Sequence, residues 1–129
     1  MFLFLPILSL QFLVSVNDKF PIEVDTLADA MKQLGIADSD VTSISIASGI
    51  LPQKELVDEQ SDYSITQKYA NLQIFSTVSG SIENNALPAN SFYHSNIQRV
   101  SLPTLEKVGK SCFYNCTKLN NFTANNLQE

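Results

Sequence analysis

The sequence has one histidine, no tryptophan and only two cysteines, Cys112 and Cys116, among its 129 residues. A four-cysteine zinc site and a fold held together by several disulfides are excluded, because each needs more thiols than the chain offers. On a helix, the i, i+4 spacing of the pair would put both Cα atoms near the upper limit for a disulfide. We therefore expect two core thiols, no bound metal and no cofactor.

Charged residues are also scarce, at 16% of the chain against about a quarter in average soluble domains. Asn, Ser, Thr and Gln take their place, and an uncharged polar surface of this kind is common outside cells. The net charge of −5 offers no cationic face to phosphate groups, so nucleic acid is excluded as a partner. The hydrophobic content of 44% is sufficient for one domain with a core of its own.

Catalytic motifs are missing as well. The four glycines are isolated along the chain, so no glycine-rich phosphate-binding loop occurs. Candidate carboxylates for acid–base chemistry lie in polar stretches, where we expect them to be solvated. They are Asp38, Asp40, Asp58, Glu59 and Asp62.

The first sixteen residues, MFLFLPILSLQFLVSV, hold no charged side chain. Their length matches the apolar core of a secretory signal peptide and is short of the about 20 residues that span a bilayer. A signal peptide over residues 1–16 is favoured, although a positive n-region is missing and Val14-Ser15-Val16 is a poor cleavage site. A buried N-terminal strand and an uncleaved anchor are the alternatives.

An N-terminal cap is expected over residues 17–40, with a helix over 25–34 after a short connector. Asp25 or Thr26 can begin the helix, and apolar residues then recur at i, i+3, i+4 and i+7. Gly35 supplies the residue that ends it. A helix with one apolar stripe packs on another element, and its position suggests the N-terminal end of a repeat array.

Internal repetition is the most informative signal. Four segments, which begin at Val41, Leu72, Ile97 and Leu119, share the pattern apolar-x-x-apolar-x-apolar. The fourth and sixth positions lie two residues apart, so a strand points both to the same face. The starts are 31, 25 and 22 residues apart, and the last two intervals match the about 20–29 residues of a leucine-rich repeat. Strands are expected near 43–46, 74–77, 99–102 and 121–124.

The returning halves of two repeats also agree. Residues 87–95 and 108–116 both start with an apolar residue, break at Pro or Gly and continue as Phe-Tyr-x-small. In a solenoid this is a corner followed by a bulky anchor that points into the shared core. We expect Phe92 and Phe113 to stack in successive coils. The longer first interval contains residues 50–70, which we interpret as a polar, irregular turn.

The run 97–119, IQRVSLPTLEKVGKSCFYNCTKL, closely resembles one repeat of the BspA-like leucine-rich repeat proteins. The resemblance is fair over 72–96, partial over 119–129, thin at 41–46 and absent from residues 1–40. It implies a surface or secreted antigen that adheres or binds host molecules, and it brings no catalytic residues. Cys112 departs from the family pattern, in which Ala is usual. The positions that match are Leu102-Pro103, Leu105, Val108-Gly109, Phe113, Cys116 and Leu119.

A thiol nucleophile, Cys112 or Cys116, activated by His94 is the sharpest enzyme hypothesis. Superposing the repeats puts His94 against Asn115, one residue before Cys116. However, Cys116 occupies a core position, where a neutral thiol is inert, and no third residue orients the histidine. A lone Cys and His pair is a weak signature, so we expect no enzyme.

Outward side chains of successive strands in a solenoid form one continuous face, which is the usual ligand face. Arg99 is the best single candidate for a contact there, because its planar fork can meet a carboxylate. The neighbouring hydroxyls could bind a ligand, although Ser and Thr also simply suit an exposed strand. The eight residues of this strand face are Ser43, Ser45, Ile74, Ser76, Arg99, Ser101, Asn121 and Thr123.

Two N-x-[ST] sequons, Asn115-Cys116-Thr117 and Asn121-Phe122-Thr123, are candidate glycosylation sites if the chain enters a eukaryotic secretory path. A glycan on Asn121 would stand on the strand face and obstruct it. The two hypotheses therefore compete.

The expected fold class is an α/β solenoid of leucine-rich repeats over 41–129, with short parallel strands after an N-terminal capping helix. Leu127 matches Leu105, so the array stops within a repeat at Glu129, and we favour a fragment. The expected function is non-catalytic: a secreted or cell-surface protein that binds a host or matrix protein or a glycan through the strand face. Membrane contact would need an N-terminal anchor or a further C-terminal segment. The alternative is a cytoplasmic scaffold for protein–protein interaction.

Overall fold

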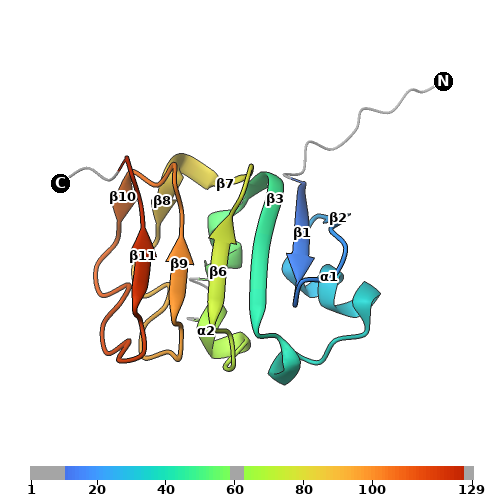
Figure 1. The fold of residues 1–129 in the computed structure, drawn as a ribbon, viewed down its shortest axis with the longest axis horizontal. Coiled ribbons are helices and arrows are strands. Elements are labelled where there is room, and N and C mark those ends of the chain that lie inside the picture. The colour runs from blue at the N-terminus through green and yellow to red at the C-terminus, as the bar shows by residue number, and fades with distance from the viewer. Residues whose placement is uncertain (1–10, 59–62, 127–129) are drawn as a thin grey trace.

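The computed structural model describes residues 11–58 and 63–126. Most of its strands belong to one mixed sheet, seen in Figure 1 with the N-terminal elements at one end and the C-terminal strands at the other. The elements are β1 (Phe12–Val16), β2 (Ile22–Val24), α1 (Leu27–Leu34), η1 (Asp38–Asp40), β3 (Ser43–Leu51), η2 (Gln53–Glu55), β4 (Val57–Asp58), β5 (Tyr63–Ser64), α2 (Ile65–Lys68), β6 (Ile74–Thr77), β7 (Ser81–Ile82), η3 (Glu83–Asn85), β8 (Ala86–Leu87), β9 (Arg99–Ser101), β10 (Lys107–Val108) and β11 (Asn121–Thr123). The large sheet has the order β11-β9-β6-β3-β1-β2, with β7 paired to β3.

Strands β3, β6, β9 and β11 form the parallel half of the sheet, at the positions where the repeat pattern predicts strands. Their register is regular: Ile44 lies beside Phe75, Phe75 beside Val100, and Val100 beside Phe122. Ile44, Phe75 and Val100 are fully buried, and the residues next to them along each strand point to solvent. A slip of one residue would turn these anchors outward, so the alternation in the sequence fixes the register.

The returning halves of the repeats lie on the opposite side of the core. Strands β8 and β10 pair in parallel, and beyond them the N–H groups of Phe92 and His94 donate to carbonyls of the next repeat at 3.0 and 2.9 Å. Phe92 stacks on Phe113 with 5.5 Å between ring centroids and contacts Phe75 at 5.6 Å. The expectation that Phe92 and Phe113 stack in successive coils is confirmed.

Gly109, at the corner of the third repeat, passes very close to the backbone of the second. A Cβ at this position would lie 2.5 Å from the nitrogen of Ala89 and 2.8 Å from the carbonyl oxygen of Leu87. Both are backbone atoms, and the Leu87 carbonyl oxygen already accepts from the N–H of Gly109 at 2.8 Å, directly after the pairing of β8 with β10. The close stacking of these two repeats therefore requires glycine at this corner.

The first repeat differs from the others because β3 is nine residues long and bends at Gly49, where φ is +87°. Residues 50–70 were expected to form an irregular, polar turn. The structure corrects this, since η2, β4, β5 and α2 lie there and Leu56, Ile65 and Tyr69 are buried in the core. A capping box between Ser64 and Gln67 begins α2.

Strands β1 and β2 are antiparallel and extend the sheet beyond β3. Phe12, Val14 and Val16 are almost fully buried and alternate with less buried residues. This is the buried-strand alternative, so cleavage after Val16 would remove a strand of the sheet. Residues 1–10 of the expected signal peptide lie outside the described residues. The connector expected before the helix likewise contains β2.

Asn17, in the turn after β1, ties the N-terminal strands to the start of β3. Its side-chain carbonyl oxygen accepts from the N–H groups of Thr42 and Ser43 at 2.8 and 3.1 Å, and its NH₂ group donates to the Asp40 carbonyl at 2.8 Å. Its backbone φ of 53° lies in the left-handed region, which Asn tolerates better than most residues. One side chain thus fixes three backbone groups.

Helix α1 begins after Thr26, whose hydroxyl accepts from Asp29 N–H at 3.0 Å, and it ends at Gly35. Its buried face packs against β1 and β2. Only α1 and the four-residue α2 are α-helical among the residues that the structure describes, so the α/β fold expected from sequence is a strand-rich repeat fold. Within that part of the chain no helix has both the length and the apolar character to cross a membrane.

Candidate binding surface

The eight residues of the strand face lie on the solvent side of the parallel half of the sheet, in two adjoining rows. Because the four strands are parallel and in register, each row crosses them at a spacing of about 4.8 Å. The first row runs Ser45–Ser76–Ser101–Thr123, and the second runs Ser43–Ile74–Arg99–Asn121. The fold therefore brings all eight together on one surface.

The row that begins at Ser45 is a ladder of half-buried hydroxyls. The Ser76 hydroxyl donates to the Ser45 hydroxyl at 3.2 Å. Each hydroxyl has one donor and two acceptor positions, so bonding along the row leaves acceptor capacity for a partner.

The row that begins at Ser43 is more exposed, and Ile74, Arg99 and Asn121 all reach solvent. Arg99 lies between Ile74 and Asn121, and no carboxylate among the described residues pairs with it. Its side chain also makes no hydrogen bond to another described residue, so within this part of the chain its five donors are available to a partner.

Strand β1 extends the hydroxyl row by one strand, which sequence reasoning missed. Ser15 lies opposite Ser45, and its hydroxyl donates to the Lys19 carbonyl at 2.7 Å. Leu13 lies on the same side of β1, opposite Ser48. The signal for this extension was the alternation along Phe12–Val16, but the long apolar run around it favoured a signal peptide.

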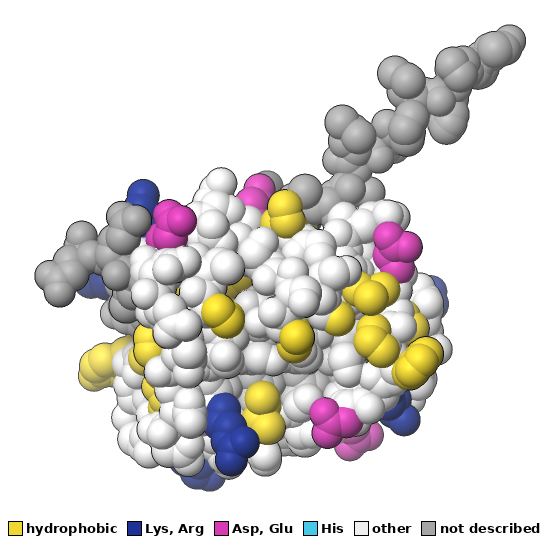
Figure 2. Space-filling model, turned by 45° about the horizontal axis from the view of Figure 1, so that its top comes forward, with side chains coloured by type: hydrophobic (Ala, Val, Ile, Leu, Met, Phe, Trp, Pro, Cys, Tyr) yellow, Lys and Arg dark blue, Asp and Glu magenta, His cyan; other side chains and the backbone are white. Residues whose placement is uncertain are grey.

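The face of the molecule seen in Figure 2 carries few charged side chains. In the view of Figure 2, uncharged side chains and backbone cover most of the molecule, and the hydrophobic, acidic and basic side chains are scattered in small groups. A surface of this kind suits hydrogen bonding and shape complementarity more than long-range electrostatic steering.

The two thiols are used in packing. The Cys112 thiol donates to the Pro88 carbonyl at 3.0 Å, and the Cys116 thiol donates to the Phe92 carbonyl at 2.9 Å, both in the preceding repeat. Burial raises the pKa of the Cys112 thiol. His94 pairs with the side chain of Asn115 at 2.7 Å rather than with sulfur. The geometry thus shows no hydrogen bond between His94 and either thiol, which is the contact that the thiol-nucleophile hypothesis needs.

Metal and acid–base sites find no support in the described part of the chain, where no three His, Cys, Asp or Glu residues cluster as metal ligands would. Asp38, Asp40 and Asp58 are exposed. Glu59 and Asp62 lie outside the described residues, as does Leu127.

Both sequons are accessible. Asn115 is exposed, has a left-handed backbone with φ of 58° and bonds to His94 through its side chain. Asn121 is exposed on the strand face beside Arg99. A glycan on Asn121 would therefore cover Arg99, whereas one on Asn115 would stand on the returning side.

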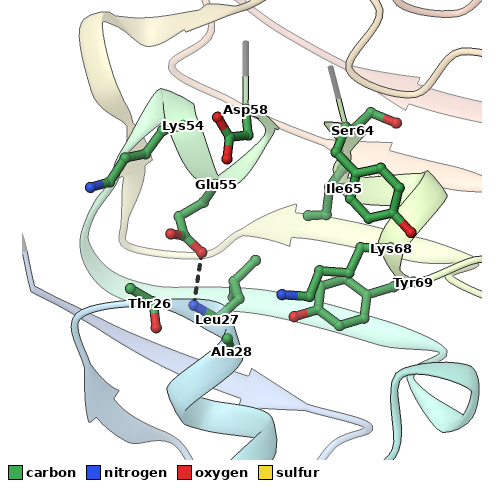
Figure 3. A pocket seen from close by; sticks show the side chains of 11 residues that line it. Thr26, Leu27, Ala28, Lys54, Glu55, Asp58, Ser64, Ile65, Lys68 and Tyr69 are labelled. Carbon is green, nitrogen blue, oxygen red and sulfur yellow. Dashed lines mark hydrogen bonds between the residues drawn. The ribbon is translucent and has the colours of Figure 1, made fainter. Parts of the chain in front are cut away.

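A small cavity of about 230 Å³ lies where α1, η2 and α2 meet (Figure 3). Glu55 accepts from the N–H of Leu27 at 2.9 Å and so holds the start of α1 against η2. The hydroxyl of Tyr69 is buried here and has no hydrogen-bond partner among the described residues. Burial, then Asp38 and Glu55, raise its pKa. The cavity is below the usual size of a ligand site, and its groups join the N-terminal elements to the first repeat.

Parallel strands repeated in register, returning segments stacked behind them and phenylalanine anchors in successive repeats define a leucine-rich-repeat protein. The family model of the BspA type leucine rich repeat region, with six copies, matches residues 64–129. The chain therefore belongs to the BspA-type leucine-rich-repeat family. Repeats of this kind are interaction modules that bind other proteins. No curated protein and no solved structure matches the chain.

Proposed function

We propose that this chain is a non-catalytic recognition module, secreted or displayed on a cell surface, that binds a protein or glycan partner through the strand face. The observation that carries the proposal is the register of β3, β6, β9 and β11, which gives two continuous rows of accessible side chains. Such a face offers many weak contacts over a broad area, as recognition surfaces of repeat proteins do.

Arg99 would be the main anchor of this surface. It is exposed, has no acidic partner among the described residues and lies between an exposed Ile74 and Asn121. An arginine flanked by an apolar and an amide side chain can place its fork on a carboxylate of the partner. The partner of this region would therefore present at least one acidic group.

We interpret the stacked repeats as a solenoid whose N-terminal end is covered by β1, β2 and α1. Buried Leu27, Ala30 and Met31 of α1 support this reading, because they cover apolar surface at the end of the sheet. Repeat arrays need such terminal elements to protect the core of their last coil.

A cytoplasmic scaffold for protein–protein interaction is the second candidate. Two observations favour it: Phe12–Val16 belongs to the core, and both thiols are free. The N-terminal residue of the natural protein separates the two candidates. Secretion by cleavage upstream of β1 predicts a mature protein that starts before Phe12, whereas an intact Met1 on a cytoplasmic protein would support the scaffold.

The strand face is tested by reversing the charge of one basic residue that lies on it. A second basic residue, on the opposite side of the core, serves as the control. Arg99→Glu should weaken binding to cell surfaces or immobilised matrix by at least tenfold, because it sets a carboxylate against the acidic group of the partner. Lys107→Glu, on exposed β10, makes the same change of charge and should leave binding unaltered. If both variants weakened binding equally, the proposal that the strand face binds the partner would be contradicted.

A further inference from the structure

A second candidate site lies across the core from the strand face, among the returning halves of the first three repeats. It is a cavity of about 420 Å³, within the size range of small-ligand sites. Among the residues that the structure describes, no charged side chain lines it. The lining residues of this tyrosine pocket are Val57, Ser64, Gln67, Asn90, Tyr93 and Ser111.

Tyr93 ends a stack of exposed aromatic rings. The ring of Tyr114, in the next repeat, covers one face of Tyr93 with 5.3 Å between centroids and 15° between planes. The imidazole of His94 packs edge-on at 4.4 Å. Three of the six lining residues belong to the preceding repeat, so the ring face directed at the pocket is the one opposite Tyr114. Tyr93 is 37% exposed, and within the described part of the chain its ring contacts only those of His94 and Tyr114.

The polar groups of the pocket are neutral and available. The side-chain oxygen of Gln67 accepts from Ser64 N–H at 2.8 Å, which leaves the NH₂ group of Gln67 as a donor. The side chains of Asn90 and Ser111 make no hydrogen bond within the described part of the chain. Amides and hydroxyls together offer both donors and acceptors. A ligand rich in hydroxyl groups, which also donate and accept, complements this set.

We propose that the tyrosine pocket binds one neutral pyranose ring of a carbohydrate. The apolar C–H face of the sugar packs on the uncovered face of Tyr93, in the place that a further aromatic ring of the stack would take. Its hydroxyls bond to Gln67, Asn90 and Ser111. A charged sugar is disfavoured, because none of the described lining residues would supply an opposite charge.

A proline-rich peptide is the competing occupant, since such peptides dock in grooves lined by aromatic rings. They require open slots between the rings. Tyr93 and Tyr114 are 5.3 Å apart, within the about 4.5–7 Å of rings in direct contact, so no prolyl ring fits between them. The neutral, hydroxyl-matching lining therefore favours the sugar.

The test is a titration of the full chain, labelled with ¹⁵N, with the methyl glycosides of glucose, galactose, mannose and N-acetylglucosamine, and separately with a proline decapeptide. At least one glycoside should shift the side-chain amide signals of Gln67 and Asn90 saturably, with a Kd of about 1–10 mM, typical of one small ring. Tyr93→Ala should weaken this binding at least tenfold. Asn90→Gly, which keeps the left-handed backbone (φ 66°) and removes the amide, should also weaken it.

Tyr63→Ala is the matched control, because Tyr63 is 48% exposed in β5 and does not line the pocket. This variant and Arg99→Glu should both keep wild-type sugar affinity, which separates this site from the strand face. The proposal is overturned if no glycoside moves the pocket signals, if Tyr93→Ala binds as the wild type does in a folded state, or if the proline peptide alone binds there.

Discussion

Replacing Phe12 with alanine tests whether strand β1 belongs to the folded protein. The Phe12 side chain is 1% exposed, between β2 and β3 in the N-terminal half of the sheet. Removing a fully buried phenylalanine ring forfeits its transfer free energy and leaves a cavity, at a cost of about 3–5 kcal/mol. A domain of this size has about 5–15 kcal/mol of total stability, so the loss should be plain in urea unfolding followed by circular dichroism.

Phe20 provides the matched control, eight residues along the chain. It is 89% exposed in the turn between β1 and β2, so Phe20→Ala should change the unfolding free energy by less than about 0.5 kcal/mol. If residues 1–16 were a removable leader outside the fold, both variants would unfold like the wild type. A loss below about 1 kcal/mol for Phe12→Ala would therefore refute the assignment of β1 to the core.

Three further changes test the stacking and the N-terminal junction. Gly109→Ala should cost about 1–3 kcal/mol in urea unfolding, because the added methyl group meets backbone that cannot move aside. Asn17→Ala should cost about 2–3 kcal/mol by the same measurement, since it loses four side-chain hydrogen bonds, three of them to backbone groups, and strains the left-handed backbone. Asn17→Gly should recover only the backbone part. Burial raises the pKa of the Cys112 thiol above its ordinary 9.0, so the folded state keeps a proton that the unfolded state releases. Stability should therefore fall as pH rises above about 9, and Cys112→Ala should remove this dependence in unfolding measured from pH 8 to 9.5, below the range in which Tyr69, whose pKa burial also raises, contributes.

The parallel half of the fold could be predicted because its determinants are local. Ile44, Phe75 and Val100 recur at one position of a short pattern, and a strand turns each of them to the core. The same alternation placed the eight residues of the strand face. Because side chains alternate along a strand, the residues next to the buried ones must point outward.

The sequence left the buried strand β1 as the less favoured alternative to a signal peptide, because an apolar run near a chain start has the same composition in both cases. Only pairing with β3, 27 or more residues away in sequence, separates the two cases. Tyr69 and Leu56 were missed for a related reason: single apolar anchors in a polar stretch show no period, and only the packing of α2 and η2 reveals them.

The tyrosine pocket depends on a different kind of information. The Phe-Tyr pairs at 92–93 and 113–114 predict one inward and one outward ring in each repeat, and the structure has Phe92 and Phe113 stacked inside and Tyr93 and Tyr114 stacked outside. The periodicity does not predict the irregular first repeat. There the short helix α2 takes the place that a third outward tyrosine would have. The irregular first repeat therefore creates the tyrosine pocket, and the regular second repeat supplies the aromatic ring of Tyr93 that lines it. A binding site in an array of this kind is best sought where the regular stack ends against an irregular repeat.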